Sequence, residues 1–128
     1  MSYFFSKQLD VDFEEARNYI EEQLKEYGFG IVSEIDMDQK FRQKLNVDFR
    51  RYKILGACSP MHAYTAVQSE EHIGLMLPCN VVIQEKIKGK TLVSVIDPVA
   101  SMQAIENPQL RDTARDIQSK LKMFLETL

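Results

Sequence analysis

A chain of 128 residues with 45% hydrophobic and 27% charged residues has the size and composition of one soluble globular domain. Its formal net charge of −3 argues against the broad basic surface of a nucleic-acid-binding protein. No apolar run approaches the ~18 residues of a membrane span, and the N-terminus lacks a signal-peptide pattern. These features predict a single cytoplasmic domain over residues 1–128, with reduced cysteines and no nucleic-acid or membrane partner.

Helix starts are marked by caps and prolines. Asp12 with Glu15 three residues later gives a capping-box pattern, and Gly28 stands where a left-handed C-terminal residue is expected. Ser59-Pro60 and Asn107-Pro108 each place a favourable N-cap before a proline at the first helical position. With apolar residues recurring every three or four positions, these signals predict four helices. The expected helices span Asp12–Tyr27, Met37–Leu45, Pro60–Ser69 and Pro108–Leu128.

Five strands are predicted from alternating or continuous apolar runs. They are expected at Tyr3–Gln8, Phe29–Ile35, Arg50–Ala57, Gly74–Lys86 and Thr91–Asp97. The short helix between the second and third strands is expected to turn Phe41 and Leu45 toward the core. Since strands outnumber helices and a turn at Lys88-Gly89 links the last two strands, the sequence predicts an α+β fold with a mainly antiparallel sheet.

Three motifs in the middle and late parts of the chain are distinctive: ILGACSP at residues 54–60, GLMLPCNV at 74–81 and IDP at 96–98. With Ala63 after the first, they resemble the domain-of-unknown-function 302 family, which includes the TT1751-like structures. The resemblance implies a TBP-like β-α-β4-α architecture with short inserted helices, and homodimers. Family members often have Asn where Ser59 stands and Pro where Met61 stands. The family has no established activity, so the resemblance implies no particular chemistry.

The two cysteines are the first candidates for a site. Cys58 ends a predicted strand directly before a helix, where the helix dipole and free N–H groups stabilise a thiolate. Cys79 follows Pro78 inside a predicted strand, and a proline there indicates an edge, a bulge or a site. For both cysteines the alternative is a small buried hydrophobic residue of the core.

A metal site is one extension of this hypothesis. His62 lies four residues after Cys58, so Cys58, Cys79 and His62 are candidate ligands of a soft metal such as zinc or copper(I). Family members often have an apolar residue at the position of His62, which makes an exposed helix histidine the competing interpretation. No cofactor can be identified from the chain.

Four further residues flank the same motifs. Pro60, Pro78, Asn80 and Asp97 are candidate ligand contacts, because the motifs bring them to the ends of the predicted strands. Asn80 points to the face opposite Cys79 and is a candidate to bond a ligand or a neighbouring strand. Asp97 is a candidate to cap the turn at Pro98 or to face a pocket.

Three functions are therefore weighed. The first is a binding module for a small ligand, a metal or a sulfur species, built around the two cysteines. The second is a non-catalytic homodimer that binds a protein or peptide through an apolar strand and groove; the sequence shows no nucleophile triad or acid–base pair that favours a hydrolase instead. The third is a thiol redox protein, which requires the two Cα atoms to lie within about 7 Å.

Overall fold

The structure, a computed structural model, describes residues 2–128 and has the predicted α+β fold. The five strands are β1 (Phe4–Leu9), β2 (Gly30–Asp36), β3 (Arg51–Cys58), β4 (Cys79–Ile87) and β5 (Lys90–Ile96). The helices are α1 (Phe13–Glu26), α2 (Met37–Leu45), α3 (Pro60–Ser69), the 3₁₀ helix η1 (Ile73–Met76), α4 (Pro98–Ser101) and α5 (Pro108–Thr127). The predicted β-α-β4-α order with short inserted helices is confirmed.

The strands form one antiparallel sheet in the order β1-β5-β4-β3-β2. The first and last strands of the sequence are neighbours in the sheet: β1 pairs with β5, with Phe4 opposite Ile96. In the centre, β3 and β4 pair with Gly56 opposite Asn80 and Ala57 opposite Cys79. This register places the two cysteine motifs of the sequence at the same end of adjacent strands.

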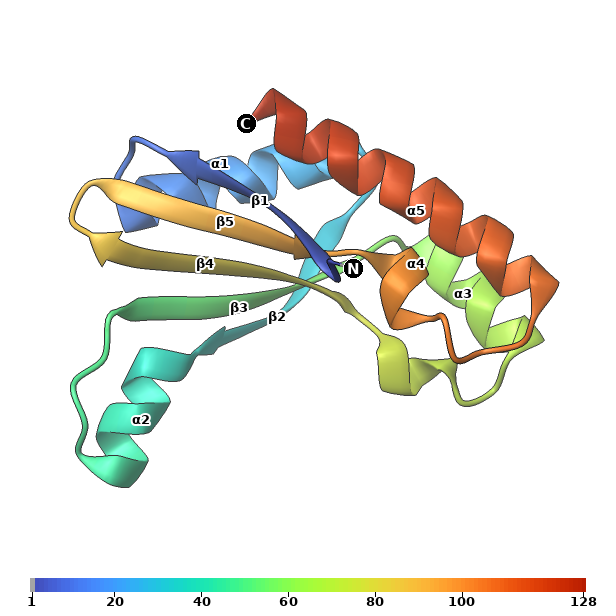
Figure 1. Cartoon of the computed structure of the whole chain (residues 1–128), viewed down its shortest axis with the longest axis horizontal. Helices are drawn as coiled ribbons and strands as arrows, with labels where there is room; N and C mark the ends of the chain where they lie inside the picture. The colour runs from blue at the N-terminus through green and yellow to red at the C-terminus, as the bar shows by residue number, and fades with distance from the viewer. Residues whose placement is uncertain (1) are drawn as a thin grey trace.

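Two long helices cover one face of the sheet (Figure 1). Helix α1 contacts β4 and β5, and α5 contacts β1. The core between these layers includes five side chains that are 0% exposed: Ile20, Leu55, Val81, Leu121 and Phe124. Each such side chain stabilises the fold by about 1.5–3 kcal/mol relative to an exposed one. None of the helices over residues 2–128 is both long and apolar enough to cross a membrane.

The opposite face of the sheet is open. Helix α2 extends below it at one end, and η1 with the adjoining loops extends below it at the other (Figure 1). Side chains alternate along a strand, so Tyr52 and Ile54 of β3 point to this face while Leu55 and Ala57 enter the core. The open face is therefore a shallow concave surface between two projections.

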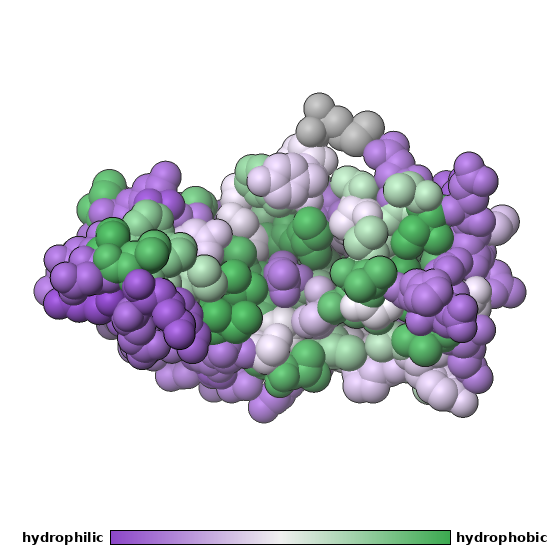
Figure 2. Space-filling model, turned by 90° about the horizontal axis from the view of Figure 1, so that it is seen from below, coloured by the Kyte–Doolittle hydropathy of each residue, from purple (hydrophilic) through white to green (hydrophobic). Residues whose placement is uncertain are grey.

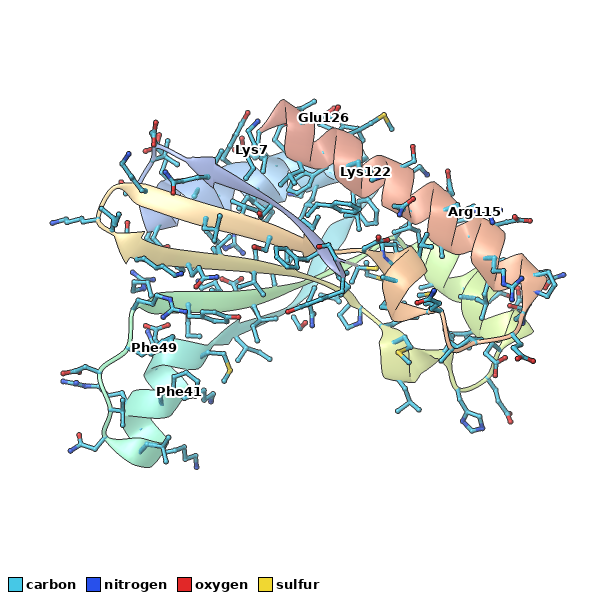
Figure 3. All side chains as sticks on the ribbon, viewed as in Figure 1. Lys7, Phe41, Phe49, Arg115, Lys122 and Glu126 are labelled. Atoms are coloured by element: carbon cyan, nitrogen blue, oxygen red, sulfur yellow. The ribbon has the colours of Figure 1, made fainter. Side chains whose placement is uncertain are left out.

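Helix α2 is attached to the sheet by aromatic rings. The ring of Phe49 lies 5.4 Å from that of Phe41 and 6.3 Å from that of Tyr52, centroid to centroid (Figure 3). Asp38 accepts a hydrogen bond of 3.1 Å from the backbone N–H of Tyr52. The prediction that Leu45 turns inward is wrong: it is 66% exposed, because α2 extends past the sheet edge and no second layer covers its far end.

The fourth strand begins later than predicted. Residues 73–76 form η1, and the strand starts at Cys79, after a cis peptide bond between Leu77 and Pro78. In a strand over Gly74–Lys86, Leu75 would share the face of Cys79, but it is 85% exposed. An apolar run does not by itself distinguish a strand from a short helical turn, which explains this error.

Helix starts follow the predicted caps in two of three cases. The carboxylate of Asp12 accepts a hydrogen bond of 2.9 Å from the N–H of Glu15, and the amide oxygen of Asn107 accepts one of 3.1 Å from that of Gln109. Ser59 precedes α3 as predicted, but its side chain makes no capping bond. The hydroxyl of Ser59 is directed to another partner, described below.

Candidate functional site

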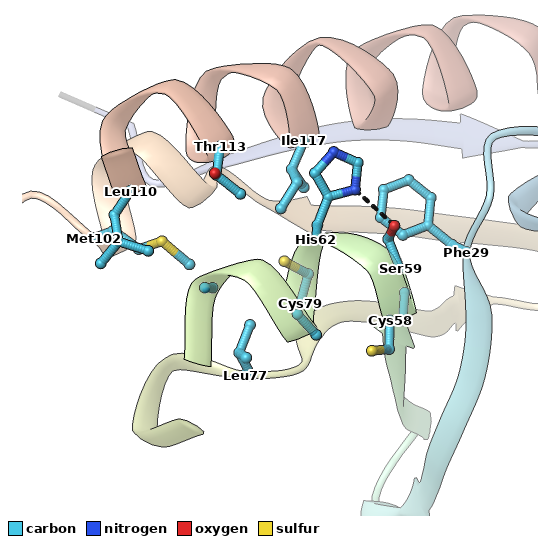
Figure 4. Close-up of a pocket in the computed structure, with 13 residues that line it drawn as sticks. Phe29, Cys58, Ser59, His62, Leu77, Cys79, Met102, Leu110, Thr113 and Ile117 are labelled. Carbon is cyan, nitrogen blue, oxygen red and sulfur yellow. Dashed lines mark hydrogen bonds between the residues drawn. The ribbon is translucent and has the colours of Figure 1, made fainter. Parts of the chain in front are cut away.

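A small apolar cavity lies beside the two cysteines, where β3 and β4 meet α3 and α5 (Figure 4). Its volume is about 20 Å³, enough for about one water molecule. Any larger ligand would require these elements to move apart. The cavity is lined by Phe29, Ala57, Cys58, Ser59, His62, Ala63, Ala66, Leu77, Cys79, Met102, Leu110, Thr113 and Ile117.

The two thiols differ in their surroundings. Cys79 is only 6% exposed, whereas Cys58 is half-buried, and both are free cysteines. Burial, with a smaller contribution from Cys58, raises the pKa of the Cys79 thiol to about 11. Cys79 is therefore protonated at neutral pH, which makes it a poor nucleophile and a poor metal ligand. The core interpretation of Cys79 has the stronger physical support.

His62 is held between two oxygen atoms. Its Nδ1 lies 2.7 Å from the Ser59 hydroxyl, and its Nε2 lies 2.5 Å from the Asp116 carboxylate on α5. The hydrogen bond from His62, and then one from Lys120, lower the pKa of the Asp116 carboxyl. Sequence reasoning missed Asp116, because it lies on the exposed side of a helix 54 positions away and carries no local signal.

The predicted metal ligands do not converge on a common centre. Over residues 2–128, no group of three His, Cys, Asp or Glu side chains is placed to hold a metal ion. Of the proposed trio, Cys58, Cys79 and His62 all border the small cavity, but the imidazole nitrogens of His62 already have Ser59 and Asp116 as partners. A metal at these residues stays a prediction.

The remaining predicted residues lie in three different places. The Asp97 carboxylate accepts a hydrogen bond of 3.0 Å from the N–H of Val99 and one of 2.9 Å from the side-chain amide of Gln118. It therefore caps α4 and ties it to α5. Pro60 is exposed at the start of α3, and Pro78 lies next to Gly56, directly before β4.

Asn80 lies in a wider hollow on the open face of the sheet. The hollow has a volume of about 300 Å³, at the lower end of the range typical of small-molecule sites. Figure 2 shows this face, with hydrophobic side chains gathered over its middle and hydrophilic ones toward both ends. The hollow is lined by Tyr3, Phe4, Tyr52, Asn80, Val82, Gln84, Leu92, Ser94, Val95 and Ile96.

An unpaired cation, Arg50, contacts two residues that line this hollow, Tyr52 and Gln84. Arg50 donates from Nε to the side-chain oxygen of Gln84 at 2.8 Å. Its guanidinium lies 4.3 Å from the ring centroid of Phe49 and 5.9 Å from that of Tyr52. Within residues 2–128 it has no carboxylate at ion-pair distance, whereas the neighbouring Arg51 pairs with Glu14. The guanidinium retains free N–H donors for an anion.

Other basic residues of this segment are neutralised. Lys53 is only 7% exposed, and its Nζ lies 2.7 Å from the Glu34 carboxylate and 3.5 Å from that of Asp36. Burial lowers the pKa of Lys53, but its hydrogen bond to Glu34 and the neighbouring negative charges outweigh burial and raise it. The neighbouring cations Arg51 and Lys53 are thus paired with carboxylates, which sets Arg50 apart from them.

Comparisons with known proteins agree on the fold. The family model described as Domain of unknown function DUF302 matches residues 5–128. The chain is also similar to a crystal structure of an uncharacterized conserved protein DUF302 from Bacillus stearothermophilus. The two share 25% sequence identity and superpose with a TM-score of 0.89 over 98% of each chain. No curated protein matches the chain.

Proposed function

Because the chain belongs to the family described as Domain of unknown function DUF302, we propose its function from the geometry of the molecule: it binds a small amphipathic anion on the open face of its sheet. The observation that carries this proposal is an apolar hollow beside an arginine, Arg50, which bonds to Gln84 of its lining and has no carboxylate partner within residues 2–128. It keeps the small-ligand class expected from the sequence and moves the site from the cysteines to Asn80 and its neighbours.

The centre of the hollow supports an apolar ligand body. Val82, Leu92 and Ile96 are half-buried there, so part of their surface faces solvent. Covering apolar surface contributes about 25 cal/mol per Å². The side chains of Asn80 and Ser94 interrupt this surface and supply a few polar groups that orient a ligand.

Arg50, beside the hollow, supports an anionic group on the ligand. Two aromatic rings lie beside the guanidinium, and Gln84 fixes its Nε. A guanidinium whose orientation is fixed loses less conformational freedom when it binds a carboxylate or phosphate with its remaining N–H groups. A charge-assisted hydrogen bond of this kind contributes about 1.5–3 kcal/mol.

The cysteine-centred alternatives have less support. The cavity beside Cys58 and Cys79 has room for about one water molecule, and the raised pKa of Cys79 opposes thiolate chemistry there. In the ladder Cys79 is opposite Ala57, so Cys58 is one residue out of register with it. A ligand, a metal or a disulfide at the two cysteines would require the surrounding elements to rearrange. A small ligand on the open face would not.

Two fluorescent probes test the proposal. Anilinonaphthalene sulfonate carries an anionic group, and N-phenylnaphthylamine is its neutral counterpart. We expect saturable binding of the anionic probe to one site and weaker binding of the neutral probe. Val82→Glu, which places a negative charge in the apolar hollow, should weaken binding of both probes, by at least tenfold for the anionic one. Val32→Glu, on the exposed edge strand β2 and 64% exposed before substitution, is the matched control and should bind like the wild type.

Arg50→Gln separates the two halves of the proposal. It should weaken binding of the anionic probe about tenfold, equivalent to about 1.4 kcal/mol, and leave the neutral probe unaffected. Binding of the anionic probe that is unchanged in both Val82→Glu and Arg50→Gln would overturn the proposal. Analytical ultracentrifugation identifies the other occupant of this face: a dimer that Val82→Glu dissociates would show that a second copy of the chain covers the hollow, as the family resemblance implies.

A further inference from the structure

A second candidate site lies at the start of α3, away from the open face. Ser59, His62 and Asp116 form a continuous hydrogen-bonded chain, with separations of 2.7 Å between the first pair and 2.5 Å between the second (Figure 4 shows the Ser59–His62 bond). We propose that this chain is an acyl-transfer site, in which Ser59 is the nucleophile, His62 is the general base and Asp116 orients the imidazole.

The hydrogen-bond partners determine the tautomer of His62. An ionised carboxylate only accepts hydrogen bonds, so Asp116 requires the proton on Nε2. In the neutral imidazole, Nδ1 then carries a free electron pair and accepts the hydrogen bond of the Ser59 hydroxyl. This is the arrangement that a general base needs, because the acceptor nitrogen already faces the proton that it is to remove.

The same position supplies donors for an oxyanion. The first N–H groups of a helix have no partner within the helix, and Ser59 makes no capping bond with its side chain. The backbone N–H groups of Met61 and His62 consequently have no hydrogen-bond partner within residues 2–128. An N-cap side-chain oxygen normally accepts hydrogen bonds from the N–H groups at these two helical positions. Both N–H groups therefore point to the neighbourhood of the Ser59 hydroxyl, where an oxyanion would form.

The surroundings favour a small ester with an apolar acyl group. Ser59 and His62 border an open hollow of about 640 Å³, which is lined also by Tyr27, Met61, Tyr64 and Lys120. Met61 is 74% and Tyr64 65% exposed, so both offer apolar surface to a substrate. The hollow is open to solvent, so an ester can reach the Ser59 hydroxyl directly.

The proposed reaction balances in two steps. The Ser59 Oγ attacks the ester carbonyl carbon while its proton moves to Nδ1 of His62. The bond from that carbon to the alcohol oxygen then breaks, and the departing oxygen takes the proton from Nδ1, which leaves an ester of Ser59. Water attacks this ester in the same manner, releases the acid and restores the Ser59 hydroxyl.

The competing explanation is that the chain only braces α3 against α5. Acetylation by p-nitrophenyl acetate, mapped by peptide mass spectrometry on the wild-type protein, distinguishes the two. We expect an acetyl group on Ser59 and a burst of p-nitrophenol. Ser59→Ala should abolish both, Asp116→Asn should slow the burst at least tenfold, and Ser69→Ala, at the other end of α3, should behave like the wild type.

Neighbouring nucleophiles are controlled separately. Cys58→Ser should retain the acetyl group on Ser59, because the thiol is not part of the hydrogen-bonded chain. Acetylation confined to Cys58 or Lys120 in the folded wild-type protein would overturn the proposal. A lowered melting temperature of His62→Gln without any acetylation of Ser59 in the wild type would likewise assign the chain to bracing alone.

Discussion

Gly56 lies so close to Pro78 that no side chain fits at position 56. A Cβ atom placed there would collide with the ring of Pro78 and with the hydroxyl of Ser33. Both contacts sit at the junction of β2, β3 and β4, next to Asn80, which is opposite Gly56 in the ladder. The glycine of the ILGACSP motif thus allows the chain to cross closely over the end of the sheet.

Gly56→Ala is therefore expected to destabilise the protein by about 1–3 kcal/mol, since the added methyl group must displace the rigid ring of Pro78 as well as the hydroxyl of Ser33. Urea denaturation at neutral pH measures the change. Gly30→Ala is the matched control: it lies in the adjacent strand, nothing stands within 4 Å of its added Cβ, and its stability should change little. Equal stabilities of the two variants would contradict this account of the motif.

Acid should weaken the protein through Glu34. Hydrogen bonds from Arg17, and then from Lys53, lower the pKa of the Glu34 carboxyl from 4.5 to about 2. Between those pH values the unfolded chain binds the proton and the folded chain does not, so stability present above pH 4.5 is lost as the pH falls toward 2. Because the side chain is 32% exposed, solvent screening limits the effect to about 1 kcal/mol.

Glu34→Gln measures this contribution. The variant should be less stable than the wild type at pH 7 by about 1–2 kcal/mol, because Lys53 stays buried with only Asp36 as its partner. The difference in unfolding free energy should shrink as the pH is lowered. Glu22→Gln, on the exposed side of α1, is the control and should keep a constant difference. A difference for Glu34→Gln that does not depend on pH would contradict the assignment.

The parts of the fold that the sequence predicted well are those set by local signals. Helix α5 begins at Pro108 as expected, because Asn107 caps it and its apolar residues recur over five turns. Local signals were insufficient at residues 73–76, where the apolar run IGLM forms a 3₁₀ helix, and at Leu45, whose exposure depends on how far α2 extends past the sheet.

The candidate sites depend on contacts that no local pattern specifies. Cys58, Ser59 and Cys79 line one cavity, since adjacent strands bring their motifs together. Asp116 reaches His62 only because α3 packs on α5, and Arg50 lies beside the hollow because it bonds to Gln84 on the neighbouring strand β4. Long-range packing of this kind depends on the whole fold. The polar partners of His62 and Arg50 are therefore visible in the structure and not in the sequence.

Thiol reactivity should separate the two cysteines. With N-ethylmaleimide under native conditions, we expect one adduct on half-buried Cys58, and a second on Cys79 only after denaturation, because Cys79 is 6% exposed and its pKa is about 11. Cys58→Ser should take no adduct when folded. Rapid native labelling of both residues would contradict the core assignment, and stoichiometric zinc or copper in anaerobically purified protein, with both thiols protected, would establish the metal site instead.

The start of α5 offers the last test. Asn107 accepts a hydrogen bond from the N–H of Gln109 and donates one of 3.1 Å to the backbone carbonyl of Ser69, at the end of α3. Asn107→Ala removes both bonds and should lower the unfolding free energy by about 1–2 kcal/mol. Asn107→Asp is the matched control, since it keeps the cap and loses only the donor to Ser69. We expect it to lie between the wild type and Asn107→Ala in urea denaturation. If Asn107→Asp is instead as unstable as Asn107→Ala, the bond to Ser69, and not the cap, holds the two helices in place.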